Sequence, residues 1–319
     1  MPKVGYLAFF CYYKQMETHR IKFRNFEWIN LIDPARDEME KIAREFNFHP
    51  LSLDDVLSRN QRPKIDDYED YLFMVFHLPR YIKRNLRTIA LEIDVFMGKK
   101  FIITVHSGEL KPLNTIFADC EDSQKRDELG GKGPGYLLYR ILSHSFDYCF
   151  PMLDKINQKI DRLEDELYLD QSERTLEEVS LVTRDIINFR RIINPQRFVI
   201  KDLENKKYKY IAESLDIYFD DIGDRIERIW EMLDNFKEVI GILQDTNESV
   251  MTRRLNEIIK TLTIFSVIML PLTVITGFYG MNVSGLPIAS NKFASEIIIF
   301  FLVLVILGML FYFKKKKWL

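Results

Sequence analysis

Short apolar runs separated by turn residues dominate the first part of the chain and predict β-strands. Four runs have strand composition: Phe26 to Ile32, Tyr71 to His77, Thr88 to Met97, and Phe101 to Val105. Gly98-Lys99-Lys100 lies between the last two runs, so we expect a hairpin there. Asp33-Pro34 is typical of a helix start with Asp33 as N-cap, and apolar residues follow at helical spacing: Met39, Ile42, Ala43 and Phe46. Residues 1–129 are therefore predicted to form an α/β domain with a mixed sheet.

From residue 130 the pattern becomes helical. The glycine-rich run from Gly130 to Gly135 contains Lys132 but lacks the spacing and the following Ser or Thr of a phosphate-binding loop, so we interpret it as a flexible linker. Residues 130–210 are predicted to form a helical hairpin region, with breaks near Asp170 and at Asn194-Pro195. Residues 211–282 are predicted to form a long stalk helix that continues into a first membrane span at about 261–280.

Two uncharged segments near the end of the chain predict transmembrane helices. The stretch from Thr261 to Asn291 contains no Asp, Glu, Lys or Arg, and a bilayer core requires about 20 apolar residues of helix. We therefore expect residues 283–292 to form an external loop and residues 293–313 to form the second span. A buried hairpin of a soluble protein is disfavoured, because soluble core helices rarely run this far without a polar face.

The flanking charges predict the orientation in the membrane. Arg253, Arg254 and Lys260 precede the first span, residues 314–319 form a basic tail after the second, and the loop between the spans carries only Lys292. Since positive charge marks the cytoplasmic side, we expect a multi-pass protein of the cell (inner) membrane with both termini in the cytoplasm. The chain is thus an α+β membrane protein with a cytosolic α/β domain and a helical stalk.

Composition narrows the function. A hydrophobic content of 47% beside 29% charged residues and a net charge of −2 shows that polar and apolar residues are segregated, and nothing indicates a nucleic-acid partner. We find no nucleophile–base pair, so we do not expect an enzyme. Three cysteines are predicted to be reduced structural thiols: Cys11, Cys120 and Cys149. Five histidines are too dispersed along the chain to favour a zinc site: His19, His49, His77, His106 and His144.

A polar and small-residue stripe follows the stalk into the first span. Heptad steps from Asn256 give the set Asp245, Ser249, Thr252, Asn256, Ile259, Thr263, Ser266, Leu270, Thr273, Gly277 and Gly280. Hydroxyl and amide groups within a bilayer face another helix or water. Two spans cannot enclose a conduit, so a pore would require a symmetric homo-oligomer. Dry helix packing remains an equal alternative, and the pattern does not decide whether Leu262 or Thr263 faces inward.

Tyr279-Gly280-Met281-Asn282 at the outer end of the first span resembles the signature of the CorA family of divalent-cation channels, which carry magnesium into cells. The resemblance extends through residues 269–273, both spans and the Lys-Lys-Lys-Lys-Trp-Leu tail. The stretch from Gln61 to Lys64 and the acidic run from Asp161 to Glu166 also look like the cytosolic domain of the family.

The resemblance implies roles for individual residues. Gly280, Met281 and Asn282 would form a selectivity ring that binds hydrated Mg²⁺, and Asn256 a second polar ring. Three apolar residues would be constrictions: Ile259, Leu262 and Leu270. Regulatory Mg²⁺ would bind Asp221 and Asp245, but Tyr81-Ile82-Lys83 lacks the acidic partner that the family carries after the tyrosine, and the loop after the motif lacks acids.

The expected function is therefore passive, potential-driven uptake of Mg²⁺ by a homo-oligomer that we expect to be a pentamer in the lipid bilayer, closed by cytosolic Mg²⁺. Co²⁺ and Ni²⁺ are alternative substrates. A transporter for Zn²⁺, Co²⁺ or Ni²⁺ with the same architecture, or a non-conducting signalling scaffold anchored in the membrane, are the alternatives.

Overall fold

The computed structural model describes residues 18–84, 86–169, 173–281, 283, 286–288, 293–316 and 318. The chain forms two compact units, Met1–Leu243 and Gln244–Leu319, whose boundary falls within one long helix. Asn282 of the predicted selectivity motif, Cys11 and Lys292 lie outside the described residues.

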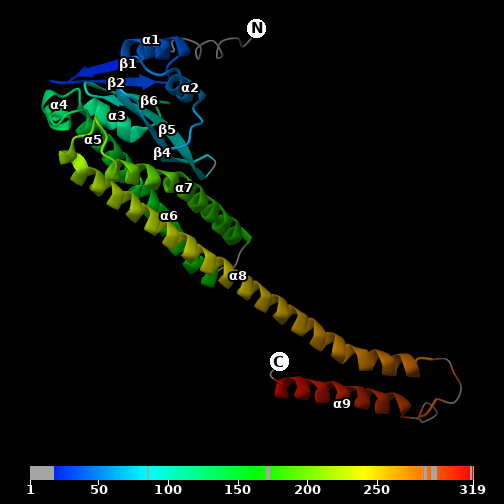
Figure 1. The fold of residues 1–319 in the computed structure, drawn as a ribbon. Helices are drawn as coiled ribbons and strands as arrows, with labels where there is room; N and C mark the ends of the chain where they lie inside the picture. Colours follow the sequence, from blue (N-terminus) through cyan, green and yellow to red (C-terminus); the bar gives the residue numbers. More distant parts are fainter. Residues whose placement is uncertain are drawn as a thin grey trace, which may run out of the picture. The chain divides into compact units, whose positions relative to one another are not determined.

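The first unit is built on a six-stranded sheet with the order β1-β2-β6-β5-β4-β3 (Figure 1). The strands are β1 (Thr18–Lys22), β2 (Glu27–Ile32), β3 (Lys64–Asp67), β4 (Tyr71–Ile82), β5 (Arg87–Gly98) and β6 (Phe101–His106). Strands β2 and β6 pair in parallel, and every other pair is antiparallel. The predicted mixed sheet, its four strand runs and the β5–β6 hairpin are confirmed.

Helices cover both faces of this sheet. The central strands carry apolar side chains on both of their faces, and each face needs a layer of helices to bury it. Along β4, Leu72, Met74 and Phe76 belong to one apolar cluster and Phe73 and Val75 to the other. The smaller cluster lies under α1 (Arg36–Phe46) and α2 (Pro50–Ser58). The larger one packs against α3 (Lys111–Asp119), α5 (Pro134–Asp147), α6 (Phe150–Leu169) and α7 (Glu173–Asn205) (Figure 1).

The first part of α8 (Asp216–Tyr279) completes the larger cluster through a regular seam. Its buried residues recur in steps of three and four: Phe219, Ile222, Ile226, Ile229, Leu233, Phe236, Ile240 and Leu243. This is a heptad pattern, which holds one side of a helix against its neighbours. The next seam positions are Asn247, Val250, Arg254 and Glu257, so the apolar contact has no continuation. The boundary between the two units follows from this change.

Two local predictions were wrong. Asp33 does not cap α1: its backbone is left-handed (φ 47°), its carboxylate pairs with Arg59 at 2.6 Å, and α1 begins after Ala35. Helix α7 continues through Pro195, because the loss of one N–H donor is outweighed by buried neighbours: Ile192, Ile193, Val199 and Ile200. A break instead separates α7 from α8, at residues 206–215, where only a 3₁₀ turn (Glu213–Leu215) forms.

The glycine-rich run is not a flexible linker. Gly130 ends α4 (Ser123–Gly130), and the N–H of Gly133 donates to the carbonyl of Gly130 at 3.0 Å. Gly133 has φ +95°, a conformation that favours glycine, and it precedes α5 directly. The Nζ of Lys132 lies over the rings of Tyr136 and Tyr218, at 4.9 and 4.8 Å from their centroids. The run is therefore a tight turn within the first unit.

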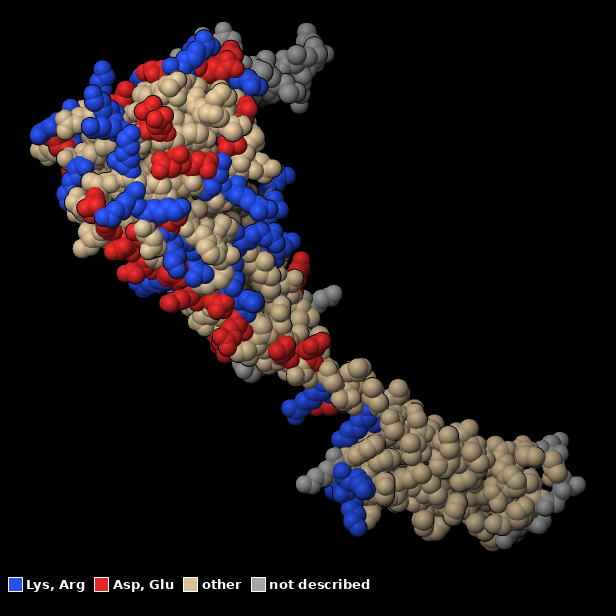
Figure 2. All heavy atoms as spheres, viewed as in Figure 1, with Lys and Arg blue, Asp and Glu red and all other residues tan. Residues whose placement is uncertain are grey.

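The second unit contains the end of α8 and α9 (Ala294–Lys315), and both helices are long and apolar enough to cross a membrane. In the hydropathic window of α8 none of the residues is buried, and in that of α9 only 6% are. Figure 2 shows the consequence on the face that it draws: acidic and basic side chains cover the first unit, whereas the visible described surface of the spans is uncharged apart from basic residues gathered at one end. Exposed Glu296 lies in the first turn of α9. The two predicted spans are confirmed as candidate membrane helices.

A buried hydrogen-bond chain fixes the end of β6. Trp28 Nε1 donates to Thr104 Oγ1 (3.0 Å), and that hydroxyl donates to Asn30 Oδ1 (2.7 Å). The N–H of Gly108 donates to His106 Nδ1 (3.0 Å), so His106 carries its proton on Nε2 and donates it to the same Asn30 oxygen (3.0 Å). These hydrogen bonds require the imidazole of His106 to be neutral, because its Nδ1 accepts one of them. Burial therefore lowers the pKa of His106 to about 4, with Arg59 contributing.

This chain predicts an acid-dependent loss of stability. The unfolded imidazole, with a pKa near 6.5, binds a proton more tightly than the folded one, so the stabilisation is complete above pH 6.5 and declines as the pH falls toward 4. Between those limits the free energy of unfolding of the wild type should fall by about 3 kcal/mol relative to His106→Gln. Urea unfolding of both detergent-solubilised proteins at several pH values measures this change in the free energy of unfolding. A stability difference between the wild type and His106→Gln that does not change with pH would contradict the assignment.

Candidate functional site: the first membrane span

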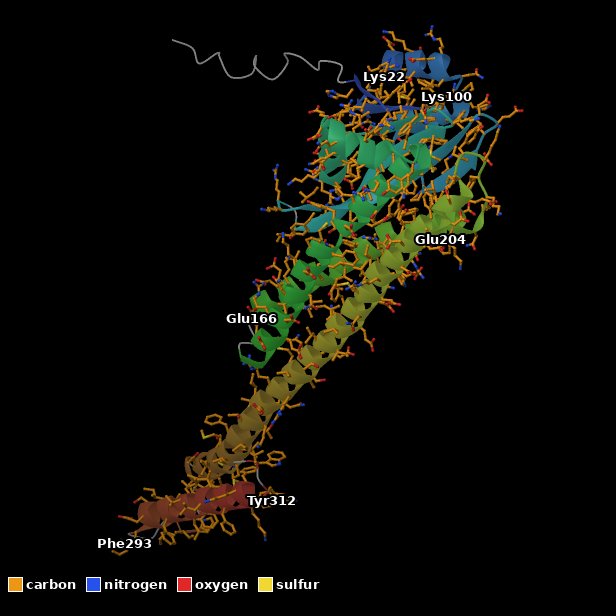
Figure 3. All side chains as sticks on the ribbon, turned by 90° about the vertical axis from the view of Figure 1, so that its left-hand side faces the viewer. Lys22, Lys100, Glu166, Glu204, Phe293 and Tyr312 are labelled. Carbon is orange, nitrogen blue, oxygen red and sulfur yellow. The ribbon has the colours of Figure 1, made fainter. Side chains whose placement is uncertain are left out.

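The two membrane helices pack on each other through one face each. Helix α9 runs beside the last part of α8 in both views (Figures 1 and 3), and Phe293 and Tyr312 mark its opposite ends in Figure 3. Partly covered side chains recur on α8 at helical spacing: Ile264, Ile268, Pro271, Ile275 and Tyr279. On α9 the corresponding set is Ala294, Ile298, Leu302, Val305, Met309 and Phe313. These apolar faces form the contact within the hairpin.

The predicted polar stripe lies on the opposite face of α8. At about 100° per residue, its residues centre roughly 160–200° from the face that α9 covers. Asn256, Ser266, Thr273 and Gly277 are exposed, Thr263 is half-buried, and the apolar members are open: Ile259 is 51%, Leu262 63% and Leu270 66% exposed. The stripe is therefore not used for packing inside the chain. Leu262 and Thr263 both border this open face, so both remain candidates for the inward position.

The hydroxyl groups of the stripe direct their protons into the helix. Thr263 Oγ1 donates to the carbonyl of Ile259 (2.7 Å), and Thr273 Oγ1 donates to that of Met269 (2.9 Å). A hydroxyl whose proton is engaged in this way presents only oxygen lone pairs outward. Lone pairs accept hydrogen bonds from the water around a cation. The open face thus combines apolar side chains with acceptor groups.

The outer end of α8 coincides with the predicted selectivity motif. The helix ends at Tyr279, and the N–H of Gly280 makes the last helical bond, to the carbonyl of Thr276 at 2.9 Å. A Cβ at position 280 would also lie 2.9 Å from that carbonyl oxygen, which is tighter than such contacts normally allow. Met281 is 50% exposed. Gly280 therefore allows the chain to leave the helix just before Asn282, whose own placement is outside the described residues.

Asp221, a predicted regulatory ligand, is held by groups of its own chain. Its Oδ2 accepts hydrogen bonds from Tyr139 Oη (3.2 Å) and Arg225 Nε (3.0 Å), and Arg225 also pairs with Asp147. The four-residue spacing of Asp221 and Arg225 was a visible signal of this pair, and sequence reasoning missed it. A metal ion at Asp221 would have to compete with the guanidinium.

Asp245 and the β4–β5 turn complete the candidate regulatory residues. Asp245 is exposed on α8, two residues beyond the end of the seam. The Nζ of Lys159 donates a hydrogen bond to the phenol oxygen of Tyr81, near the end of β4, at 3.3 Å. Lys83 and Arg84, which follow Tyr81 in the sequence, are exposed. Among the described residues, no group of three or more His, Cys, Asp or Glu side chains is arranged to hold a metal ion. The structure thus brings none of the predicted regulatory acids together within one chain.

Comparison with known proteins gives matches over nearly the whole chain. Residues 24–315 match the model of the family described as CorA-like Mg²⁺ transporter protein. The cobalt/magnesium transport protein CorA of Thermotoga maritima is 29% identical over 92% of this chain and 83% of its own. The zinc transport protein ZntB of Yersinia pseudotuberculosis is 24% identical over 92% and 88%. The CorA magnesium transporter structure from Methanocaldococcus jannaschii has the same fold, with a TM-score of 0.84 at 22% identity and 94% of each chain covered.

The opposed faces of α8 predict different chemical accessibility. In a chain with Cys11 replaced by serine, Thr273→Cys should react with a charged methanethiosulfonate in membranes, because it lies on the open face. Ile275→Cys should not react, because it lies in the α9 contact. The native thiols should stay silent, since Cys120 and Cys149 are buried and burial raises the pKa of Cys120 to about 12. Mass spectrometry of the labelled protein measures the extent of reaction, and equal labelling of both variants would contradict the opposition.

Proposed function

We propose that this chain, which belongs to the CorA-like Mg²⁺ transporter family, is a passive Mg²⁺ uptake channel in which several identical copies surround a pore lined by the α8 stripe. Membership makes it a membrane transporter of divalent cations; the choice of Mg²⁺, the pore lining and the assembly are the proposal. The observation that carries it is the open, acceptor-rich stripe, which faces away from α9. Such a face requires either neighbouring copies or water.

The selectivity step is proposed to be recognition of the hydrated ion. Mg²⁺ releases its six waters reluctantly, so the first contact should come from oxygens that accept hydrogen bonds from those waters. The amide oxygen of Asn282 and the backbone carbonyls of Gly280 and Met281 are of this type. A neutral ring attracts a dication without holding it as tightly as carboxylates would. Since relatives include cobalt/magnesium and zinc transport proteins, Co²⁺, Ni²⁺ and Zn²⁺ are the competing substrates.

The membrane potential supplies the driving force. Moving two charges through 100 mV releases about 4.6 kcal/mol, enough for roughly a thousandfold concentration ratio. The proposed orientation places both termini and the first unit in the cytoplasm. The basic side chains at one end of the spans in Figure 2 support it, because Lys314 and Lys315 end α9 on that side.

Passive flux requires a means of closure, and we propose binding of cytosolic Mg²⁺ between copies in a homo-pentamer. Asp245 is the acid best placed for this role, because it is exposed and forms no ion pair with another described residue. Asp221 is a weaker candidate, since Arg225 and Tyr139 already occupy its Oδ2. Lys83 lies where relatives of this family carry an acid, so closure should require more Mg²⁺ than a site with two opposed acids.

Replacing Asn282 by alanine should abolish Mg²⁺ uptake into vesicles that contain the reconstituted protein, because the ring would lose its side-chain acceptors. A Mg²⁺-sensitive dye inside the vesicles measures uptake, and size-exclusion chromatography with light scattering checks the oligomer. Asn291→Ala, an amide in the same external loop, is the matched control and should conduct normally. Unchanged uptake by Asn282→Ala would refute the role of the motif. No uptake by the wild type for any divalent ion would refute transport and favour a scaffold.

The two regulatory candidates should behave differently. Loading vesicles with Mg²⁺ on the cytosolic side should slow Co²⁺ uptake by the wild type, and Asp245→Asn should need several-fold more Mg²⁺ for the same inhibition. Asp221→Asn should change inhibition less but lower the melting temperature, because Arg225 loses one of its two carboxylates. Equal loss of inhibition in both variants would place Asp221 in the regulatory site as well.

A further inference from the structure

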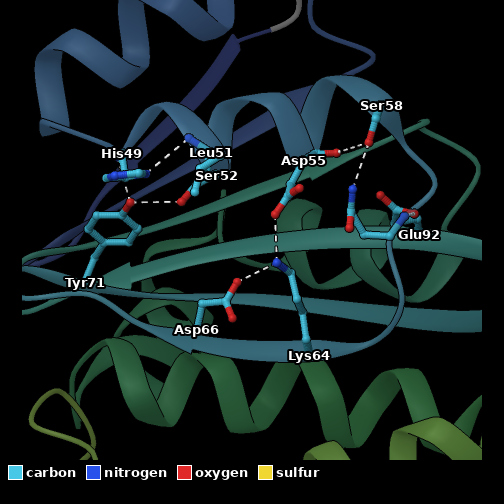
Figure 4. A network of polar contacts seen from close by, with 10 residues as sticks. His49, Leu51, Ser52, Asp55, Ser58, Lys64, Asp66, Tyr71 and Glu92 are labelled. Carbon is cyan, nitrogen blue, oxygen red and sulfur yellow. Dashed lines mark hydrogen bonds and ion pairs between the residues drawn. The ribbon is translucent and has the colours of Figure 1, made fainter.

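A solvent-accessible cavity lies in the first unit, far from the membrane spans in sequence. It has a volume of about 320 Å³ and is lined by the segment that follows α2 and by strands β4, β5 and β6. Eight of its lining residues are polar or charged, and six of these matter for the argument: Arg59 and Gln61 from the segment after α2, His77 from β4, Glu92 and Asp94 from β5, and His106 from β6. Figure 4 shows Glu92 beside the segment that follows Ser58, with Lys64, Asp55 and Asp66 as a neighbouring network.

Two carboxylate oxygens of this cavity have no hydrogen-bond partner. Asp94 is only 2% exposed, and its Oδ1 is unpaired; the Oε1 of Glu92 is buried and unpaired as well. The other oxygen of Glu92 accepts from the N–H of Gln61 (3.3 Å) and lies 3.5 Å from His77 Nε2. Glu92 and Asp94 are two residues apart on β5, so both point from the same face of the strand. Unpaired buried acceptors of this kind indicate a missing donor.

The positive groups around the cavity are already matched, apart from His77. Arg59 pairs with Asp33 at 2.6 Å, and Lys64 pairs with Asp55 and Asp66 at 2.7 and 2.5 Å. His106 is neutral, since its two ring nitrogens are engaged in the buried chain described above. Burial raises the pKa of Asp94, and the neighbouring Glu92 charge raises it further. Within the cavity Glu92 thus has only His77 at ion-pairing distance, and Asp94 has no ion-pair partner among the described residues.

We propose that this cavity binds a hydrated divalent cation, whose coordinated waters donate hydrogen bonds to Asp94 Oδ1 and Glu92 Oε1. A dication balances the two carboxylates. Direct coordination is not expected, because no set of three protein ligands is arranged for it among the described residues. The hydrated ion fits: a metal–oxygen distance of 2.1 Å plus a water radius gives a sphere of about 180 Å³.

This site is separate from the proposed pore and does not depend on transport. It uses β4, β5 and the end of α2, whereas the pore stripe belongs to the second unit. Its carboxylates are also distinct from Asp221 and Asp245. Binding at the cavity can therefore be measured in a chain that conducts nothing.

Mn²⁺ is a suitable probe, since its free six-line paramagnetic resonance spectrum disappears when the ion binds. The full-length protein in detergent should bind one Mn²⁺ fewer per chain in Asp94→Asn and in Glu92→Gln than in the wild type. Asp66→Asn, an acidic neighbour that pairs with Lys64, is the matched control and should bind the wild-type number. Cobalt(III) hexaammine, whose ligands do not exchange, should displace the same ion, because its N–H groups donate as coordinated water does.

Three results would overturn the proposal. One is equal Mn²⁺ binding by the wild type, Asp94→Asn and Glu92→Gln. A second is displacement by putrescine but not by cobalt(III) hexaammine, which would assign the cavity to an organic cation. The third needs no variant: wild-type crystals soaked in Mn²⁺ should show an anomalous peak in the cavity about 4 Å from the carboxylate oxygens, one water away, and an empty cavity there is decisive. Mg²⁺ uptake by Asn282→Ala and wild type tests transport independently.

Discussion

The continuous helix α8 has to satisfy two different solvents, and this constraint organises the rest of the molecule. Up to Leu243 it is amphipathic, with one apolar seam in the larger cluster and contacts to α5, α6 and α7. Beyond Thr261 it is apolar on nearly every side, as a bilayer requires. Between these parts lie about 17 residues that have neither a seam nor a lipid-compatible surface, including Arg253, Arg254 and Lys260. In this stretch the surface of the helix can be covered only by water or by another chain.

The polar stripe and the seam are related by a simple offset. Asp245 is two residues beyond Leu243, so the stripe begins about 200° around the helix from the seam. In the first unit the corresponding positions include Asp221, Arg228 and Glu238, which lie away from the buried core. One side of α8 is therefore dedicated to holding the chain together. The other side is open in the second unit, whereas in the first unit Tyr139 and Arg225 already contact Asp221. A protein that assembles around an axis needs such a division in every copy.

Sequence reasoning succeeded where a single period or a single composition decides the structure. The strand runs Tyr71 to His77 and Thr88 to Met97, the hairpin at Lys99-Lys100 and both spans were predicted because burial or lipid acts on whole segments, although β4 continues to Ile82. It failed where tertiary partners override a local rule. Arg59 draws away the carboxylate that would cap α1, and packing on the sheet carries α7 through Pro195.

The candidate site was predicted only in part for the same reason. The heptad pattern located the stripe but left dry packing equal to a pore, since periodicity does not show which face the second span covers. In the structure, α9 covers the face of α8 opposite the stripe. Arg225 as the partner of Asp221, and the paired acids Glu92 and Asp94 inside an apolar strand, were readable in the sequence. Their meaning depends on distances that no spacing rule supplies.

The crowding at Gly280 ties the end of α8 to the geometry of the mouth. A Cβ at this position would lie 2.9 Å from the carbonyl oxygen of Thr276, so a larger residue there requires the backbone to shift. That same backbone carries the carbonyl groups of Gly280 and Met281 that are proposed to face the hydrated ion. A substitution at this glycine would therefore displace acceptor atoms without changing any side chain that contacts the cation.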